Sequence, residues 1–503
     1  MKKLLSGLIA GTLLASCFLF SGCGPSADDF VQPEFSSPNL VAGATVTFES
    51  LKKGERADGA NILADDGKNW TPSYPDRKPA EGYTDGCNSY IEIKLKEVST
   101  FNTAVVKEIG NEVQYFRLMA LVDGEWVTVY QSEKIQSLRL MSFDPVTTDT
   151  VRLSIDKFRG GGAKINCIEL YNEPKRSADD FNVTVYQRLD GDVPSEILAK
   201  GEEYVDMYAQ YYDVYDTVLI FGAVNWVDGK MSFGFDDGEE GFARELAALK
   251  EIIDHRSDKD HEVRIICTAL ADGAGGNGHT GVNEFMAEHW EYVADQMVEF
   301  MKKYDLDGLD VDWEYPQTKA DWQCYDRFIE RLDNGMTAYK EDSILSAALS
   351  SGALGMSEAT LQRFDQIQYM AYDGKDEDGY QSSLQQAQEG LLGFLDKGVD
   401  LKQINIGIAA YGRPVDGAPY WANWRDVEGP DIYWNSMQYN VVCDGQLADF
   451  TFCSPALAGD KTAYALFTGT GGVMVFRLAC DKTMDDPDAV AWGIKNVLDR
   501  YTE

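Results

Sequence analysis

Acidic side chains stand at every second position of a short apolar stretch, LDGLDVDWEYPQ, which spans residues 306–317. Residues two apart in a β-strand point to the same side, so Asp310, Asp312 and Glu314 would share one face. Burying several carboxylates together is unfavourable unless they are paired, protonated or solvated, so stability does not explain the pattern. Neighbouring carboxyl groups raise one another's pKa and can share a proton. The spacing therefore predicts an acid–base site.

Strands that could position this site recur through the second part of the chain. Eight near-continuously apolar runs, most of them separated by segments of helix length, lie at residues 181–186, 217–223, 263–269, 308–314, 344–349, 366–372, 404–410 and 472–478. Parallel strands that are covered by helices on both sides have this composition. The pattern predicts an α/β fold, a (β/α)8 barrel. The acidic cluster would lie at the carboxyl-terminal mouth of its fourth strand, where barrel enzymes hold their catalytic groups.

The preceding segment, residues 38–173, has the pattern of an all-β domain. Short alternating runs such as SYIEIKL, EWVTVYQ and TVRLSI are separated by clusters of Gly, Asp and Asn. The order of these pieces resembles a discoidin-like domain of the coagulation factor C type. That resemblance implies a jelly-roll sandwich whose loops bind sugars and, in some members, a structural calcium ion. Asp65 and Asp66 are candidate calcium ligands, although acidic turns also serve simply to solvate a loop.

Residues 1–23 have the composition of a targeting segment, in which two lysines precede an apolar run that ends in small residues and Cys23. LFSGC resembles a bacterial lipobox. It predicts a lipid on Cys23 and a mature chain at the bacterial cell envelope, on its surface or periplasmic side. Cys17 in LASC is the alternative lipidated residue, and an unlipidated secretory signal is the third interpretation. Residues 24–37 and 174–180 are predicted to be linkers.

The chain is strongly acidic, with 45 Lys and Arg against 83 Asp and Glu and a net charge of -38 over 503 residues. Such a charge repels nucleic acid and anionic lipid, so we expect a neutral ligand and membrane contact through the lipid anchor only. The sequence has neither a CxxC pair nor an HExxH spacing. We therefore expect no metal in the acid–base site and no cofactor beyond the candidate calcium ion.

Further motifs around the acidic cluster carry a family resemblance. DGLDVDWEYP resembles the DxxDxDxE signature of family 18 glycoside hydrolases in its chitinase-like form. FDQIQYMAYDG resembles the sixth-strand segment of that family, and GIAAYGRP resembles its seventh-strand segment. The resemblance covers residues 181–503. It implies a retaining mechanism in which the 2-acetamido group of the sugar is the nucleophile.

The resemblance also implies a role for each matching residue. Glu314 would protonate the glycosidic oxygen and later activate water, Asp312 would orient the acetamido group, and Asp310 would pass charge or a proton behind it. Tyr372 would donate to the acetamido carbonyl oxygen. The residues expected to bind substrate are Asp307, Gln368, Met370, Asp373, Tyr411 and Phe476.

The expected reaction is hydrolysis of β-1,4 linkages after N-acetylglucosamine in chitin or its oligosaccharides. An endo-β-N-acetylglucosaminidase that acts on the chitobiose core of N-glycans is the alternative. It stays open because the third strand ends in CTALADGAGG rather than SxGG, and because Phe476 stands where the family usually has Trp. A non-catalytic glycan-binding protein is a further alternative, but such family members commonly lack the acid, and Glu314 is present.

Three tryptophans lie between the seventh and eighth predicted strands, at Trp421, Trp424 and Trp434. Large apolar rings serve equally well as the core of a small insertion and as stacking surfaces for sugar rings. The sequence leaves both roles open.

Overall fold

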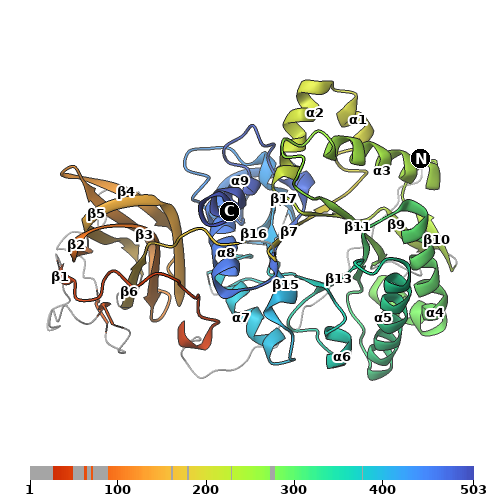
Figure 1. The fold of residues 1–503 in the computed structure, drawn as a ribbon, viewed down its shortest axis with the longest axis horizontal. Coiled ribbons are helices and arrows are strands. Elements are labelled where there is room, and N and C mark those ends of the chain that lie inside the picture. The colour runs from red at the N-terminus through yellow and green to blue at the C-terminus, as the bar shows by residue number, and fades with distance from the viewer. Residues whose placement is uncertain are drawn as a thin grey trace.

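A computed structural model describes residues 27–48, 62–64, 69–71, 89–159, 163–177, 180–227, 229–271, 278–376, 378–417, 419–443 and 445–503. The chain forms an all-β domain followed by a barrel that is surrounded by helices, and the C-terminal helix lies at the junction of the two (Figure 1). The all-β character predicted for the first part is confirmed, while its discoidin type stays a prediction.

A closed ring of parallel strands forms the centre of the second part. Its strands are, in order, β7 (Asn182–Gln187), β8 (Thr217–Ile220), β11 (Arg264–Ala271), β12 (Gly308–Asp312), β13 (Ile344–Leu349), β14 (Gln366–Tyr369), β15 (Ile404–Ala409) and β20 (Gly472–Phe476). The last strand pairs with the first, in register from Gly472 opposite Asn182. Each predicted apolar run forms one of these strands, so the barrel prediction is confirmed.

Alternate residues of these strands face the interior of the barrel. An apolar cluster fills part of this interior and consists of Tyr186, Leu219, Ile266, Ile344 and Met474. On β12, Leu309 and Val311 instead belong to the large core that the strands form with the helices. The period of two therefore turns Asp310 inward, as the sequence predicted.

Helices cover the outside of the barrel (Figure 1). They are α1 (Pro194–Leu198), α2 (Glu202–Ala209), α3 (Glu239–Ile253), α4 (Gly278–Tyr304), α5 (Lys319–Tyr339), α6 (Glu358–Leu361), α7 (Leu384–Leu395), α8 (Pro455–Thr468) and α9 (Val490–Tyr501). Capping boxes at Thr318 and Ser383 start α5 and α7. Each capping hydroxyl accepts from the backbone N–H of the N3 residue, and the side chain of that N3 residue accepts from the backbone N–H of the capping residue. Among the described residues, no helix has the length and apolar character needed to cross a membrane.

Two small antiparallel sheets are inserted between barrel strands. β9 (Val224–Val227) pairs with β10 (Lys230–Phe233) after β8. Between β15 and α8, a four-stranded sheet is formed by β16 (Tyr411–Pro414), β17 (Ala422–Asn423), β18 (Met437–Cys443) and β19 (Gln446–Thr451). Trp424 is completely buried in this insertion, and Trp434 packs edge-on against Tyr130 of the first domain with 5.6 Å between the ring centroids. Packing, not sugar stacking, is the role of these two tryptophans.

The first domain is built around two long bent strands. Its sheet contains β1 (Thr45–Phe48), β2 (Ser89–Glu108), β3 (Val113–Val122), β4 (Glu125–Ser132), β5 (Leu138–Phe158) and β6 (Ile165–Tyr171). The register between β2 and β5 shifts between Lys94 and Ser99, and β2 pairs with β1 before the shift and with β6 after it. Such bulges bend a strand, so that β2 can pair with β1 near one end and with β6 near the other.

Buried polar contacts join the first domain to the barrel. Tyr130 Oη and Arg139 Nη1 donate to Asp460 Oδ2 of α8 at 2.7 and 2.6 Å. On α9, Tyr501 Oη lies 2.8 Å from Thr103 Oγ1 of β2. All five of these residues are buried, so the two parts form one packed body.

Both predicted linkers, residues 24–37 and 174–180, are packed where the structure describes them. The hydroxyl of Ser37 donates to Glu173 Oε1 at 2.7 Å, and the backbone N–H of Arg176 donates to the last helix at 2.7 Å. The bounds of the two linkers stay a prediction. Polar and Pro-containing composition indicated a connecting segment, but it could not show the partners that hold that segment in place.

Burial raises the pKa of Glu108 to about 8 from 4.5, although the backbone N–H groups of Val113 and Glu112 donate to its Oε1. The folded chain therefore binds this proton more tightly than the unfolded chain. As a result, the free energy of unfolding falls as the pH rises from about 4.5 to about 8.

We expect Glu108→Gln to reduce this fall, because the amide keeps an acceptor oxygen and carries no charge. Urea unfolding at pH 5 and pH 8 measures the effect. The wild type should lose on the order of 2 kcal/mol more than the variant over this interval. An equal loss in both proteins would contradict the prediction.

Candidate active site

The acidic cluster runs along one face of β12 toward the carboxyl-terminal mouth of the barrel. Asp310 is completely buried, Asp312 is the last residue of the strand, and Glu314 lies two residues beyond it. Asp312 and Glu314 are both half-buried. Exposure thus increases from Asp310 toward the mouth, and Glu314 has the position nearest to an incoming ligand.

Asp310 is held inside the barrel by hydroxyl groups from neighbouring strands. Thr268 Oγ1 on β11 donates to Asp310 Oδ2 at 2.8 Å. Burial raises the pKa of Asp310 to about 6, and the hydroxyls of Thr268, Ser346 and Tyr186 offset part of that rise. A carboxyl group with this pKa is present in both protonation states near neutral pH.

Two tyrosines face the cluster from other strands, Tyr186 on β7 and Tyr372 just after β14. Burial raises the pKa of both hydroxyls well above the usual range. The charges of Asp310 and Asp312 raise the pKa of Tyr186 further, and those of Asp373 and Asp312 do the same for Tyr372. Both hydroxyls therefore keep their protons and can donate hydrogen bonds into the site.

Asp373 lies at the rim, where its carboxylate accepts three bonds. Tyr411 Oη donates at 2.6 Å, and Arg413 donates through Nε at 2.6 Å and Nη2 at 2.8 Å. The ring of Tyr411 stacks on Trp421 with 3.8 Å between centroids and 7° between planes. This network pairs the charge of Asp373 and fixes an aromatic wall beside the mouth.

Phe476 ends β20, and its half-buried ring lies between the tyrosines. Its centroid is 5.4 Å from that of Tyr186 and 6.1 Å from that of Tyr372. Phe476 thus supplies an apolar surface among the polar groups of the site. The peptide bonds Phe476–Arg477 and Glu314–Tyr315 are both cis.

The structure gathers most of the predicted site residues at one end of the barrel. They are Asp310, Asp312, Glu314, Met370, Tyr372, Asp373, Tyr411 and Phe476.

Two residues predicted to bind substrate lie elsewhere. Asp307 precedes β12, at the opposite end of the barrel, and accepts from Lys340 Nζ at 2.6 Å. Five residues of extended chain separate it from Asp312, which is about 16 Å. Gln368 is fully buried inside the barrel, where its Nε2 donates to Ser346 Oγ at 3.2 Å. The structure does not bring these two residues to the mouth, because their carboxylate and amide contact the framework of the barrel.

Four residues at or near the site were missed from the sequence. They are Tyr186, Thr268, Ser346 and Arg413. The first three are polar residues at inward positions of otherwise apolar strands, and that alternation was the available signal. Arg413 stands in the quoted GIAAYGRP segment, two residues after Tyr411 and therefore on the same side of β16.

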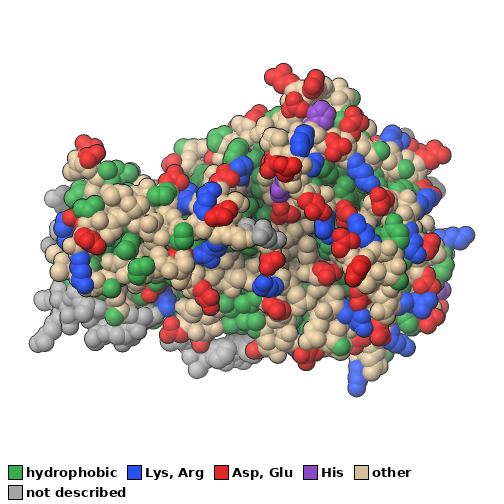
Figure 2. Space-filling view, viewed as in Figure 1, with side chains coloured by type: hydrophobic (Ala, Val, Ile, Leu, Met, Phe, Trp, Pro, Cys, Tyr) green, Lys and Arg blue, Asp and Glu red, His purple; other side chains and the backbone are tan. Residues whose placement is uncertain are grey.

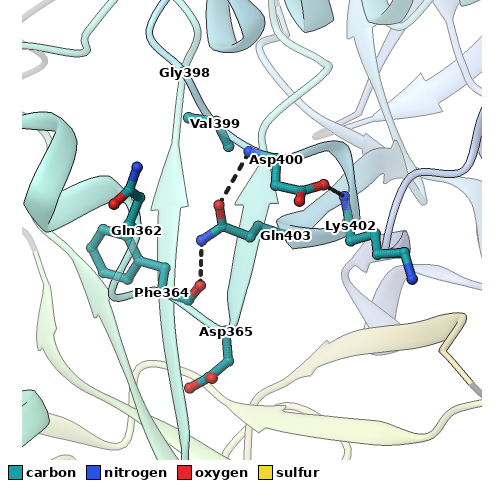
Figure 3. Close-up of a pocket in the computed structure, with 8 residues that line it drawn as sticks. All are labelled: Gln362, Phe364, Asp365, Gly398, Val399, Asp400, Lys402 and Gln403. Carbon is teal, nitrogen blue, oxygen red and sulfur yellow. Dashed lines mark hydrogen bonds between the residues drawn. The ribbon is translucent and has the colours of Figure 1, made fainter.

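A hollow of about 710 Å³ opens at the other end of the barrel (Figure 3). It is lined by Gln362, Phe364, Asp365, Gly398, Val399, Asp400, Lys402 and Gln403. The side chain of Gln403 is occupied within it, because its Nε2 donates to Phe364 O at 2.6 Å and its Oε1 accepts from Asp400 N at 3.2 Å. This hollow precedes β14 and β15, at the end of a barrel that serves stability.

Metal binding has no candidate among the described residues, where no group of three or more His, Cys, Asp or Glu could hold an ion. Asp65 and Asp66, the candidate calcium ligands, lie outside the described residues, as does Cys23. Figure 2 shows acidic side chains scattered over both parts of the molecule and interspersed with Lys and Arg. Together with the net charge of -38, this surface favours a neutral ligand.

Comparison with known proteins identifies the barrel as the shared part. The sequence model of the family described as "Glycosyl hydrolases family 18" matches residues 217–481, more than half of the 503-residue chain. A curated relative, Chitinase A1 of Niallia circulans, is 23% identical over 332 residues, which are 51% of this chain and 46% of the relative. The chain thus spans about half the length of this relative.

Solved structures of chitinases are also similar to this chain. The GH18 chitinase ChiB from Flavobacterium johnsoniae has 19% identity and a TM-score of 0.48, over 63% of this chain and 94% of that one. A chitinase from Bacteroides thetaiotaomicron has 16% identity and a TM-score of 0.48, over 62% and 95%. A class V chitinase from Nicotiana tobaccum, solved in complex with NAG4, has 14% identity and a TM-score of 0.47, over 63% and 98%.

The placement of Asp307 predicts that Asp307→Asn lowers stability and leaves turnover unchanged. The pair with Lys340 is about 30% exposed, so its loss should cost about 1 kcal/mol. Asp310→Asn, the matched change three residues later on β12, should lower kcat about 100-fold because it removes a buried carboxyl group that can titrate. Urea unfolding and kcat on a chitin oligosaccharide measure both effects, and a large loss of kcat in Asp307→Asn would refute this placement.

Proposed function

The chain belongs to glycosyl hydrolases family 18, and we propose that it hydrolyses β-1,4 linkages after N-acetylglucosamine in chitin or its oligosaccharides. One observation carries the proposal: Asp310 and Asp312 on β12 and Glu314 just beyond it run from the buried interior to the mouth, and the charges of Asp312 and Glu314 act on the hydroxyl of Tyr372. This arrangement supplies an acid, an orienting carboxylate and a hydroxyl donor. These are the groups required when the substrate brings its own nucleophile.

In the proposed mechanism, the acetamido oxygen of the sugar attacks the anomeric carbon while Glu314 gives its proton to the glycosidic oxygen. The glycosidic bond breaks, and the leaving sugar departs as an alcohol. Asp312 accepts the acetamido N–H and stabilises the cyclic oxazolinium cation, and Tyr372 donates to the acetamido oxygen beforehand. Glu314, now a carboxylate, then removes a proton from the water that opens the ring, and the configuration is retained.

Asp310 allows Asp312 to carry full negative charge when that cation forms. With its pKa near 6, Asp310 can hold the proton that the two carboxyl groups share. The cation beside Asp312 favours the state in which the proton lies on Asp310. Thr268 supports this exchange by keeping Asp310 oriented.

The remaining groups at the mouth suit a neutral sugar. Phe476 offers an apolar surface beneath the reacting ring, and the Tyr411–Trp421 stack forms an aromatic wall. The Arg413–Asp373 pair at the rim presents donors and acceptors for sugar hydroxyls. None of these contacts requires a charged substrate.

Glu314→Gln is expected to slow product formation at least about 1000-fold, because the amide cannot donate a proton. The wild type and the variant would be incubated with chitin oligosaccharides and with an N-glycosylated protein, and the products would be analysed by mass spectrometry. Glu341→Gln is the matched control, because it removes an exposed carboxylate from the segment between α5 and β13. The proposal expects oligosaccharides cut to the disaccharide by the wild type and by the control.

Two other outcomes would replace the proposal. Release of N-glycans would assign the chain as an endo-β-N-acetylglucosaminidase. No product from either substrate, with the fold intact, would assign it as a glycan-binding protein.

We also propose that the mature chain is exported and anchored at the cell envelope through a lipid on Cys23, which the sequence LFSGC supports. Cys23→Ala should then move the protein from the membrane fraction to the soluble fraction in a bacterial host and remove the lipid mass. Cys17→Ala is the matched control and should stay in the membrane fraction. Release by Cys17→Ala instead would transfer the anchor to that residue.

A further inference from the structure

The loop that carries Tyr372 forms ion pairs and a hydrogen bond with the first domain. This loop, residues 370–383, connects β14 to α7. Near its middle, Asp378 forms ion pairs with Lys134, which lies between β4 and β5, and with Arg159, which follows β5. The side chains of Lys134 and Asp378 are only 6% and 9% exposed, so this pair is shielded from solvent.

The middle of the loop is a single tight turn with a second contact to the first domain. Asp376 Oδ1 accepts from the backbone N–H groups of Asp378 and Tyr380, both at 3.0 Å. Asp376 Oδ2 accepts from Gln136 Nε2 at 3.2 Å. The first domain therefore contacts two acidic residues of this turn.

Gln381 connects this turn to the site. It is fully buried, its Oε1 accepts from Asp373 N at 3.2 Å, and its Nε2 donates to Tyr411 O at 2.9 Å. Asp373 has a φ of 67°, which residues other than glycine rarely adopt. The bond from Gln381 thus holds the backbone directly after Tyr372 in an uncommon conformation.

The barrel holds the loop at several points, and Lys461 on α8 holds both of its ends. The Lys461 Nζ is buried and donates to Ala371 O at 3.1 Å and to Ser382 Oγ at 2.8 Å. Asp373, Asp376 and Asp378 all lie between these two points. Tyr411 and Arg413 of the barrel hold Asp373. The first domain holds the next two, through Gln136 on Asp376 and through Lys134 and Arg159 on Asp378.

We infer that the ion pairs of Asp378 with Lys134 and Arg159 are a positioning device for the active site, through which the first domain holds Tyr372 and Asp373 toward Glu314. This inference rests on the proposed role of Tyr372. It makes the first domain a part of the catalytic unit, because groups more than 200 residues earlier in the chain set the geometry of the site. Asp378, Lys134 and Arg159 act through the loop and touch no substrate.

The test is a double-mutant cycle in the full chain between Asp378→Asn and Tyr372→Phe. Asparagine keeps the shape of Asp378, and the buried Lys134 still has acidic neighbours, since its charge also acts on Glu108, Glu133 and Asp376. We expect Asp378→Asn to lower kcat about tenfold on a chitin oligosaccharide, with KM changed less than about twofold. In the Tyr372→Phe background, the same change should lower kcat less than about twofold, because coupled residues are not additive.

Two further variants keep the test decisive. Asp144→Asn breaks another bond between the two parts, from Arg500 at 2.6 Å, and should leave kcat unchanged. Arg159→Met weakens the same ion pairs from the solvent side, where Arg159 is 42% exposed. Arg159→Met should therefore also lower kcat. It tests the inference even if Asp378→Asn does not fold.

The outcomes separate this inference from the function on which it rests. Equal tenfold losses in both backgrounds would mean a structural role without coupling to Tyr372, and wild-type kcat in both Asp378→Asn and Arg159→Met would mean no role. Either result overturns the inference while the proposed function stands. A wild type that releases no product, or a Tyr372→Phe variant with full kcat, overturns the inference together with the proposed function or the proposed role of Tyr372.

Discussion

A carboxyl group inside a closed barrel is the constraint on which the rest of the site depends. Asp310 has no access to solvent, and the ionised form of a buried carboxyl group is costly unless nearby groups stabilise it. Hydroxyls on adjacent strands do so, with Thr268 at 2.8 Å. Since alternate residues of a strand share a face, the position of Asp310 also sets the depth of Asp312 and Glu314. One strand thereby orders three acids from interior to solvent.

A buried carboxyl group that needs stabilising partners also lies at the junction of the two parts. Asp460 on α8 is buried, and its partners Arg139 and Tyr130 come from the first domain. Burial raises the pKa of Asp460 to about 6, while the charge of Arg139 lowers it. Removing Arg139 would leave the charge of Asp460 buried without an opposite charge, which is strongly destabilising. The three side chains therefore stabilise the interface together. These polar groups lie beside an apolar cluster in which Leu140 of the first domain packs with Phe467 and Val497 of the barrel helices.

Much of the barrel could be predicted from the sequence, because buried parallel strands have a local signature. The near-continuous apolar runs located every barrel strand, and strand direction placed Tyr372 and Phe476 at the same end as Glu314. Asp307 shows the limit of motif reasoning: it is close to Glu314 in sequence, but the length of β12 carries it to the opposite end.

Contacts between distant segments had no local signature. The pairing of Lys134 with Asp378 joins residues 244 positions apart, and nothing near either residue indicates the other. The packed segment around Ser37 was equally hidden, because its partner, Glu173, lies on the far side of the first domain in sequence. Composition identified connecting segments there, whereas only the fold shows that they are held.

The closure of the barrel has a consequence for the time course of synthesis. Its first and last strands pair where Gly472 meets Asn182, and α9 then packs against the first domain through Tyr501. A ribosome completes the first domain early, and that domain can begin to fold while the rest of the chain is still being made. The barrel cannot close until its last strand, β20, has emerged from the ribosome. The first domain and seven barrel strands are therefore made before the site can be assembled.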